Sequence, residues 1–274
     1  MAKGDTQAPT TRRASVFAVA NQKGGVGKTT TAINLGTALA AVGKRVAIID
    51  MDPQGNASTG LGIARPDRIR TTYDVLIGEC TFDDVLQPTD IPNLFVSPAT
   101  TDLSGATVEL VDEDRWEYRL RDAVSAMSPV DLALIDCPPS LDLLTVNALV
   151  AADSVLVPVQ CEFFALEGLG DLTQTIARVK AARNPGLDIR GVVLTMHDKR
   201  SNLSDQVAED VREHFKDAVY DTIIPRNVRV SEAPSHGMPV LVYDHRCAGA
   251  QAYIQLAKEV LRRDASAQNH GAAA

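Results

Sequence analysis

The chain has 274 residues, 45% of them hydrophobic, and a formal net charge of −8. This length and composition are ordinary for one globular domain with a large buried core. No apolar run approaches the ~20 residues that a membrane span needs, and residues 1–14 are polar, without the apolar segment of a secretory signal. We therefore expect a globular domain and no membrane partner.

Two further features of the composition limit the classes of function. Aromatic residues make up 4% of the chain, which argues against a base-stacking platform for single-stranded nucleic acid. An acidic net charge does not exclude a DNA partner, because one basic face is sufficient. The cysteines have neither CxxC nor metal-ligand spacing and are expected to be buried or free thiols in a reducing cytoplasm: Cys80, Cys137, Cys161 and Cys247.

The first half of the chain alternates between apolar runs and helical spacing. Val16–Ala20 predicts a strand, Thr31–Val42 a helix and Arg45–Asp50 a buried strand, whereas residues 57–72 lack periodicity and are expected to form a loop. Shorter elements follow: helices over Tyr73–Ile77, Phe82–Leu86, Leu103–Leu110 and Trp116–Met127, and a strand over Leu94–Ser97.

The second half continues the alternation. Apolar runs predict further strands over Asp131–Asp136, Ser154–Val159 and Ile189–Met196, and helical patterns lie at Leu166–Arg183, Leu203–Phe215 and Gly249–Arg263. Such alternation predicts an α/β fold with a doubly wound, mostly parallel sheet and helices on both faces. Since no repeat or long linker divides the chain, we expect one domain over 15–263, a flexible tail over 1–14 and a disordered tail over 264–274.

The stretch between the first strand and the first helix predicts an anion site. It reads NQKGGVGKTT over residues 21–30 and is called the glycine loop below. Glycines let backbone N–H groups approach phosphate oxygens, and the helix dipole favours negative charge there. Lys28 is expected to reach the β- and γ-phosphates, and the Thr29 hydroxyl to bind Mg²⁺. The predicted nucleotide-binding residues are Gly24, Gly25, Val26, Gly27, Lys28, Thr29 and Thr30.

Aspartates at the ends of two predicted strands complete the expected chemistry. Asp136 ends an apolar strand, and we expect it to reach Mg²⁺ through water. Asp52 follows the strand after the glycine loop, so in a parallel sheet it should face the same crevice and position the attacking water. Asp50 is the rival, with a structural role or a place beside the metal. For Asp50 and Asp52 alike, the alternative is a helix cap or a loop hydrogen bond.

The glycine loop departs from the ordinary phosphate-loop pattern, since Gln22 replaces a glycine and Lys23 opens the loop. Its form, K-G-G-x-G-K-T-T, resembles the deviant Walker A loop of the ParA/MinD/nitrogenase-iron-protein group of P-loop ATPases. Five other segments resemble the chromosomal ParA/Soj branch, in the expected order from about residue 15 to 263: DMDPQGN (50–56), DCPPSLDLLTVN (136–147), QCEFFALEGL (160–169), VLTMHDKRSNLSDQV (193–207) and PRNVR (225–229).

The resemblance implies an ATPase that uses ATP and Mg²⁺ with slow intrinsic turnover. Lys23 would reach across a homodimer interface to the partner's phosphates, so that ATP binding and dimerisation are one event. Lys23, Lys28 and Asp52 would be the catalytic residues. Pro225 and Asn227 would border the adenine, since a carboxamide offers both a donor and an acceptor to a base edge.

The resemblance also implies a DNA-segregation cycle. The ATP dimer would bind double-stranded DNA without sequence preference through Arg200 and Arg229. A ParB-type centromere-binding protein would then stimulate hydrolysis and release, in a cytoplasmic, nucleoid-associated protein. Residues 196–230 hold six basic and seven acidic side chains, so pairing two faces is expected to supply the phosphate contacts. Weaker DNA candidates are Lys199, Arg226, Arg246, Arg262 and Arg263.

Three other classes stay open on sequence grounds. A MinD-like membrane switch would end in a basic amphipathic helix, but here a polar tail without a Phe or Trp anchor follows Arg263. An iron-protein-type reductase would need cluster cysteines, and neither Cys137 nor Cys161 lies in such a motif. A metabolic ligase of the same superfamily would need a substrate motif, and none is identified.

Overall fold

The structure is a computed structural model that describes residues 14–271, without the side chains at position 167 and from 266 onwards. Residues 1–13 of the predicted N-terminal tail, and residues 272–274, therefore lie outside the described residues. In the part that is described, no helix is both long enough and apolar enough to cross a bilayer.

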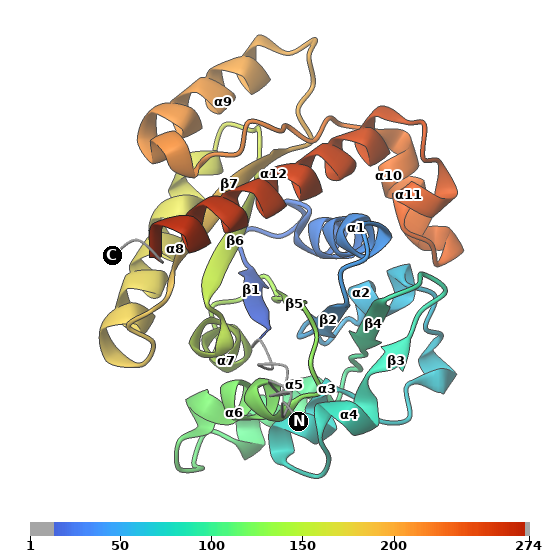
Figure 1. Cartoon of the computed structure of the whole chain (residues 1–274). Coiled ribbons are helices and arrows are strands. Elements are labelled where there is room, and N and C mark those ends of the chain that lie inside the picture. Colours follow the sequence, from blue (N-terminus) through green and yellow to red (C-terminus); the bar gives the residue numbers. More distant parts are fainter. Residues whose placement is uncertain (1–13, 272–274) are drawn as a thin grey trace, which may run out of the picture.

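The strands of the described chain form one sheet of seven. They are β1 (Ser15–Val19), β2 (Val46–Asp50), β3 (Gln87–Pro88), β4 (Leu94–Ser97), β5 (Leu132–Asp136), β6 (Ser154–Gln160) and β7 (Asp188–Thr195). Their order across the sheet is β3-β4-β2-β5-β1-β6-β7 (Figure 1). β3 pairs antiparallel with β4, and the other neighbours are parallel. The predicted mostly parallel sheet is confirmed.

Helices cover both faces of this sheet. In chain order they are α1 (Lys28–Ala41), α2 (Asn56–Gly60), α3 (Thr72–Ile77), α4 (Phe82–Val85), α5 (Leu103–Glu109), α6 (Arg119–Ala126), α7 (Leu143–Ala151), α8 (Ala165–Ala182), α9 (Asn202–Phe215), α10 (Val228–Glu232), α11 (Val240–Tyr243) and α12 (Ala248–Gly271). α1 and α12 lie on one face, and α7 and α8 lie on the other (Figure 1).

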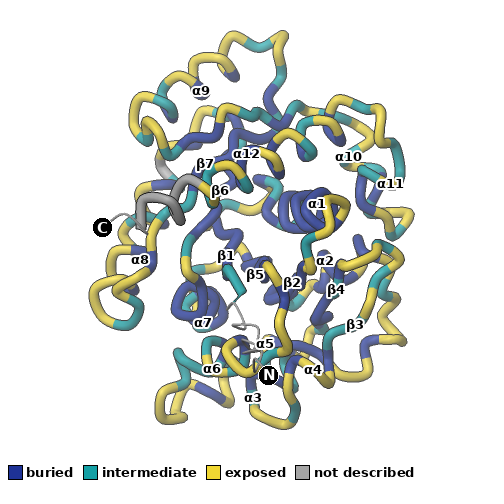
Figure 2. Tube along the Cα trace, in the orientation of Figure 1, coloured by how far each residue is buried: buried dark blue, intermediate teal, exposed yellow. Residues whose placement is uncertain are grey.

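The strand residues alternate between two hydrophobic clusters, as a period of two requires. In β1, Val16 and Ala18 pack into the cluster that contains α7 and α8 residues. Phe17 and Val19 pack into the cluster that contains α1 and α12 residues. Figure 2 shows the consequence, because the central strands β1, β2, β5 and β6 and the length of α1 are almost entirely buried. Both faces of the sheet are therefore core.

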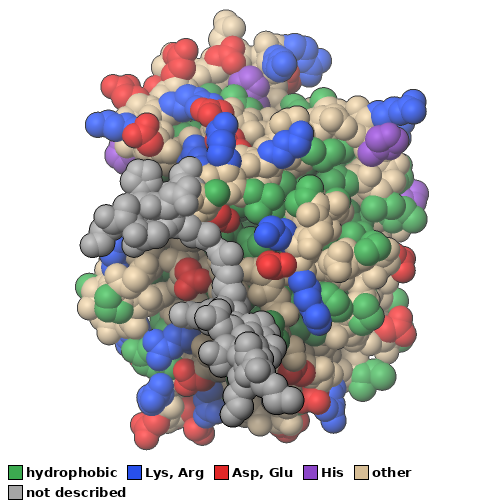
Figure 3. Space-filling model, in the orientation of Figure 1, with side chains coloured by type: hydrophobic (Ala, Val, Ile, Leu, Met, Phe, Trp, Pro, Cys, Tyr) green, Lys and Arg blue, Asp and Glu red, His purple; other side chains and the backbone are tan. Residues whose placement is uncertain are grey.

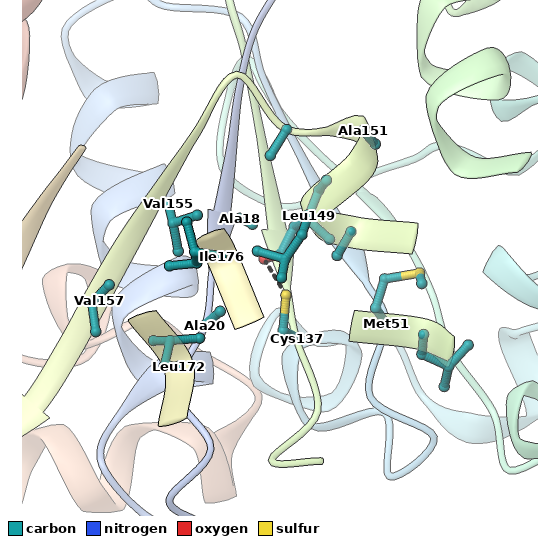
Figure 4. Close-up of a cluster of buried hydrophobic side chains, with 14 of the residues drawn as sticks. Ala18, Ala20, Met51, Cys137, Leu149, Ala151, Val155, Val157, Leu172 and Ile176 are labelled. Atoms are coloured by element: carbon teal, nitrogen blue, oxygen red, sulfur yellow. Dashed lines mark hydrogen bonds between the residues drawn. The ribbon is translucent and has the colours of Figure 1, made fainter. Parts of the chain in front are cut away.

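One of the cysteines shows how apolar the α7 and α8 side is. The Cys137 thiol points among Leu149 and Ile176 and donates a weak hydrogen bond of 3.7 Å to the Ile135 carbonyl (Figure 4). Burial raises the pKa of this thiol well above its ordinary value. Cys137 therefore packs as an apolar residue, as expected of a buried thiol.

The main differences from the predictions concern α7, α2 and α12; the short elements β3, α10 and α11 were not predicted either. The sequence pattern gave no helix for α7, because nearly all of its residues are buried and no polar stripe marks a helical period. α2 lies inside the stretch predicted as a loop; it follows Gly55, which has left-handed backbone angles. α12 continues past the predicted boundary at Arg263 to Gly271, so the described part of the tail predicted from 264 is helical.

Candidate functional site

The glycine loop is held in place by its own polar groups. The Asn21 amide donates to the Pro158 carbonyl (2.7 Å), and its oxygen accepts from the Lys23 N–H (3.0 Å). Gly25 and Gly27 have φ angles of 75° and 90°, in the left-handed region that favours glycine. The loop therefore turns directly into α1 and leaves the first N–H groups of that helix available for an anion.

A cavity of about 500 Å³, called the loop cavity below, opens beside these N–H groups. Most of the predicted nucleotide residues of the glycine loop line it, namely Gly24, Gly25, Gly27, Lys28, Thr29 and Thr30, and so does Asp52, which was predicted to position water. Val26 does not, because its side chain is buried and its carbonyl accepts from the Thr195 hydroxyl (2.8 Å). Further lining residues that were not predicted are Ile33, Gln54, Asn56, Thr59, Pro139, Met196 and Pro234.

Lys28 lies deep in this site. Its ammonium donates to the Lys23 carbonyl (3.1 Å), which closes the loop around it. Burial lowers the pKa of Lys28, and the nearby carboxylates of Asp136 and Asp52 partly oppose that effect. The ammonium is thus held beside carboxylates, at the place where phosphates were predicted.

Asp136 is a fully buried carboxylate at the end of β5. Within the described residues neither of its oxygens has a hydrogen bond of normal geometry. The Thr29 hydroxyl is nonetheless near enough to lower its pKa slightly. Burial and the neighbouring Asp50, which is its register partner across the β2–β5 pair, raise that pKa well above the ordinary value. A buried acid of this kind, next to a threonine hydroxyl, fits a divalent cation.

The surrounding residues fit Mg²⁺ in particular. No group of three or more His, Cys, Asp or Glu side chains that could hold a metal occurs in the described chain. Mg²⁺ is usually bound through one or two carboxylates together with waters and substrate phosphates. The pair of Thr29 and Asp136 at the loop cavity agrees with that pattern.

Asp50 and Asp52 have different environments. Asp50 is fully buried and accepts from the Ser58 hydroxyl (2.6 Å) and N–H (2.9 Å). Burial raises its pKa to about 6. Asp52 lines the loop cavity, and its Oδ1 accepts from the Gln54 N–H (3.0 Å). Asp50 therefore supports the turn into α2, while Asp52 faces the loop cavity.

Lys23 lies at the rim of the site and does not line the loop cavity. Its ammonium is 3.4 Å from Glu162 Oε2, and its side chain is 35% exposed. The sequence gave no signal for this contact, because 139 positions separate the two residues.

The two predicted adenine residues lie outside the loop cavity. Asn227 is the N-cap of α10, where its side-chain oxygen accepts from the Arg229 N–H (2.9 Å). Pro225 lines a different cavity of about 830 Å³, called the basic cavity below, together with Lys199, Arg200 and Arg226. Neither Pro225 nor Asn227 lines the loop cavity, and their contact with adenine stays a prediction.

The two predicted DNA residues are exposed and already paired with acids. Arg200 is 87% exposed and makes a two-pronged contact with Asp198, at 2.8 and 3.0 Å. Arg229 lies 3.0 Å from Glu232 and 3.7 Å from Asp244. On the face drawn in Figure 3, cationic and anionic side chains are likewise interspersed. No broad basic surface is visible from that side.

Among the weaker DNA candidates, Arg263 has a clear structural use. Its guanidinium donates to the Val219 carbonyl (2.8 Å) and lies 4.2 Å from the centre of the Tyr220 ring. It also pairs with Glu259 at 3.0 Å. This arginine fixes α12 to the segment after α9.

Comparisons with known proteins agree with this geometry. A family model described as "AAA domain" matches residues 14–189. The chain is 63% identical over 256 residues to the chromosome partitioning protein ParA of Caulobacter vibrioides, covering 92% of this chain and 96% of that protein. It is 54% identical over 246 residues to the sporulation initiation inhibitor protein Soj of Bacillus subtilis, covering 89% and 97%. This chain belongs to the ParA/Soj family. Relatives in the ParA/Soj family are named chromosome-partitioning ATPases.

Solved structures of the wider group share the ParA/Soj fold. Cobyrinic acid a,c-diamide synthase from Mycobacterium smegmatis, with bound ADP and magnesium, has a TM-score of 0.82 and 36% identity over 93% of this chain and 96% of that one. The cell division ATPase MinD of Pyrococcus furiosus has a TM-score of 0.72 and 29% identity over 91% and 99%. The predicted P-loop ATPase fold is confirmed. The metabolic-enzyme alternative therefore has a structural neighbour, but at lower identity than the partitioning proteins.

Proposed function

We propose that the chain is an ATP-driven DNA-segregation switch. ATP with Mg²⁺ binds in the loop cavity, and two protomers pair so that Lys23 of each contacts the other's nucleotide. The observation that carries this proposal is the loop cavity itself, where Lys28, Thr29 and Asp52 line one space beside the partnerless carboxylate of Asp136. The diamide synthase with bound ADP and magnesium supports the same ligands here.

Each residue has a part in hydrolysis. Lys28 donates to phosphate oxygens, and its burial strengthens that contact because water screens it little. Asp52 is held by the Gln54 N–H and accepts a hydrogen bond from the attacking water. Thr29 and Asp136 would hold the magnesium ion, which would supply charge neutralisation on the phosphates. Turnover is slow until a partner completes this geometry.

DNA binding follows from pairing two faces, neither of which is strongly basic by itself. Arg200 and Arg229 form exposed ion pairs, which contribute little stability and can be exchanged for DNA phosphates. Each neutralised phosphate adds about −0.9 to the salt slope, so doubling the contacts in a dimer raises affinity sharply. The occupant is double-stranded DNA of any sequence at the nucleoid, and a ParB-type protein stimulates hydrolysis and release.

A membrane-binding role for α12, as in the MinD-like alternative, has less support. The apolar residues of α12 pack into the core with α1, among them Tyr253, Leu256 and Val260. That side of the helix is therefore already used within the domain.

Light scattering with ATP, with ADP and without nucleotide tests the switch. We expect a dimer only with ATP, and a monomer in all three states for Lys23→Ala, which keeps its ATP affinity. Lys258→Ala, an exposed lysine on α12, is the matched control and should dimerise as the wild type does. An ATP dimer that survives Lys23→Ala would refute the cross-interface role.

A further inference from the structure

Glu162 lies between the glycine loop and the basic cavity. It lies two residues after the end of β6, and its two carboxylate oxygens face different cations. Oε2 is 3.4 Å from the Lys23 ammonium of the glycine loop, and Oε1 is 3.9 Å from the guanidinium of Arg226, which lines the basic cavity. The Gln160 amide donates to Oε1 as well. One carboxylate thus connects the nucleotide site with the surface proposed to bind DNA.

The geometry leaves the Lys23 ammonium as the one part of that residue free to change partners. The Lys23 N–H is held by Asn21 at 3.0 Å, and its carbonyl by the Lys28 ammonium at 3.1 Å. A Cβ placed on Gly168 of α8 would lie 3.9 Å from the Lys23 Cβ, so α8 packs closely beside the side-chain base. The ammonium itself is at the rim, in reach of Glu162 and of solvent.

We propose that Glu162 is the positioning residue for Lys23 and that Arg226 competes with Lys23 for it. The inference rests on the proposed function, because it concerns the ATP-dependent dimer. In the free chain Glu162 holds the Lys23 ammonium against its own subunit. In the dimer the phosphates of the partner's nucleotide take the ammonium, and Glu162 keeps Arg226 as its cation.

Charge explains why a second cation is needed. A half-exposed ion pair contributes little, so phosphates that carry several negative charges can displace Glu162 from Lys23. The carboxylate left behind would then repel those phosphates. Arg226 is close enough to offset that repulsion, and its contact with Glu162 can shorten once Lys23 has left. The movement of Lys23 from Glu162 to the phosphates thereby changes the contact that Arg226 makes at the basic cavity.

The proposal predicts changes of opposite sign at the two residues. Glu162→Gln removes the competitor of the phosphates, so the ATP dimer should tighten by about two- to fivefold, the effect of an exposed ion pair. Arg226→Ala should weaken the dimer by a similar factor. Lys23 is then the only cation left to pair with Glu162, and once Lys23 has moved to the phosphates nothing offsets the negative charge of the Glu162 carboxylate. In a Glu162→Gln background, Arg226→Ala should have no effect on dimerisation.

The experiment measures the dimer dissociation constant with ATP and without DNA by analytical ultracentrifugation for the wild type, the two single variants and the double variant. ATP affinity of the monomer, measured below the dimer constant, should be unchanged in all four. Glu209→Gln, an exposed acid on α9, is the matched control and should leave dimerisation unchanged.

Two results would overturn the inference. An unchanged dimer constant in Glu162→Gln overturns it, and so does an Arg226→Ala effect that persists in the double variant, since Arg226 would then act without Glu162. A wild type that stays monomeric with ATP would instead refute the proposed function itself.

Discussion

The loop cavity and the segment from Met196 to Val230 differ in how their charged side chains are compensated. In the first, the Asp136 carboxylate is buried with no hydrogen bond of normal geometry from the described residues, and Lys28 is held beside it. In the second, Arg200 and Arg229 are exposed and paired with acids of their own surroundings. The nucleotide site is therefore electrostatically incomplete, whereas the proposed DNA surface is neutralised by itself.

This difference bears on how each region responds to its ligand. A cation and phosphates complete the loop cavity, so single residues there should have large effects. DNA has to replace existing ion pairs, so each arginine should contribute modestly and mainly through salt dependence. The predictions below are ordered from the largest expected effect to the smallest.

The largest effect is expected at Asp52. Asp52→Ala should lower ATP turnover by about a hundredfold or more, the contribution of a positioned acid–base group, and should leave ATP affinity nearly unchanged. Steady-state hydrolysis and nucleotide titration measure the two quantities. Asp67→Ala, an exposed acid, is the control. Wild-type turnover in Asp52→Ala would remove Asp52 as the water-positioning group.

A smaller loss is expected at Lys28. Lys28→Ala should weaken ATP binding by about 10- to 100-fold, because charge-assisted hydrogen bonds to phosphate are lost. A fluorescent ATP analogue reports the affinity, with Lys258→Ala as the matched control. ATP binding within about threefold of the wild type would contradict the difference proposed between the two regions. A buried lysine would then contribute no more to ligand affinity than an exposed arginine does.

The smallest effect separates two roles of Asn227. As the cap of α10, its loss in Asn227→Ala should lower the free energy of unfolding by about 1 kcal/mol, and Asn227→Ser should restore most of it. We expect both variants to bind ATP within about threefold of the wild type. Denaturant unfolding and nucleotide titration decide the matter, and a tenfold loss of ATP affinity in Asn227→Ser would instead support the adenine contact.

The sequence predicted the loop cavity well because its chemistry is local. Lys28 and Thr29 are adjacent in the chain, and Asp52 and Asp136 lie at strand ends that a parallel sheet brings to one edge. Met196 could not be found in this way, because it reaches the cavity by the packing of β7 against the glycine loop.

Contacts between residues far apart in the chain could not be predicted from the sequence either. The pairing of Glu162 with Lys23 depends on where β6 ends relative to the glycine loop. The resemblance placed Asn227 at adenine; the structure shows its side-chain oxygen accepting from the Arg229 N–H at the start of α10, and the adenine contact stays a prediction. The α7 helix was missed for a different reason, since a helix buried on all sides has no periodic polar stripe.

The most direct test of the account is the binding of random-sequence duplex DNA with ATP, with ADP and without nucleotide, across a salt series. We expect binding only with ATP, with a steep loss as salt rises. Arg200→Ala should flatten the salt slope by about 2, one lost phosphate contact per protomer. Arg178→Ala, an exposed arginine on α8, should leave it unchanged. Equal binding in all nucleotide states, or no binding by an ATP-dependent dimer, would contradict the account.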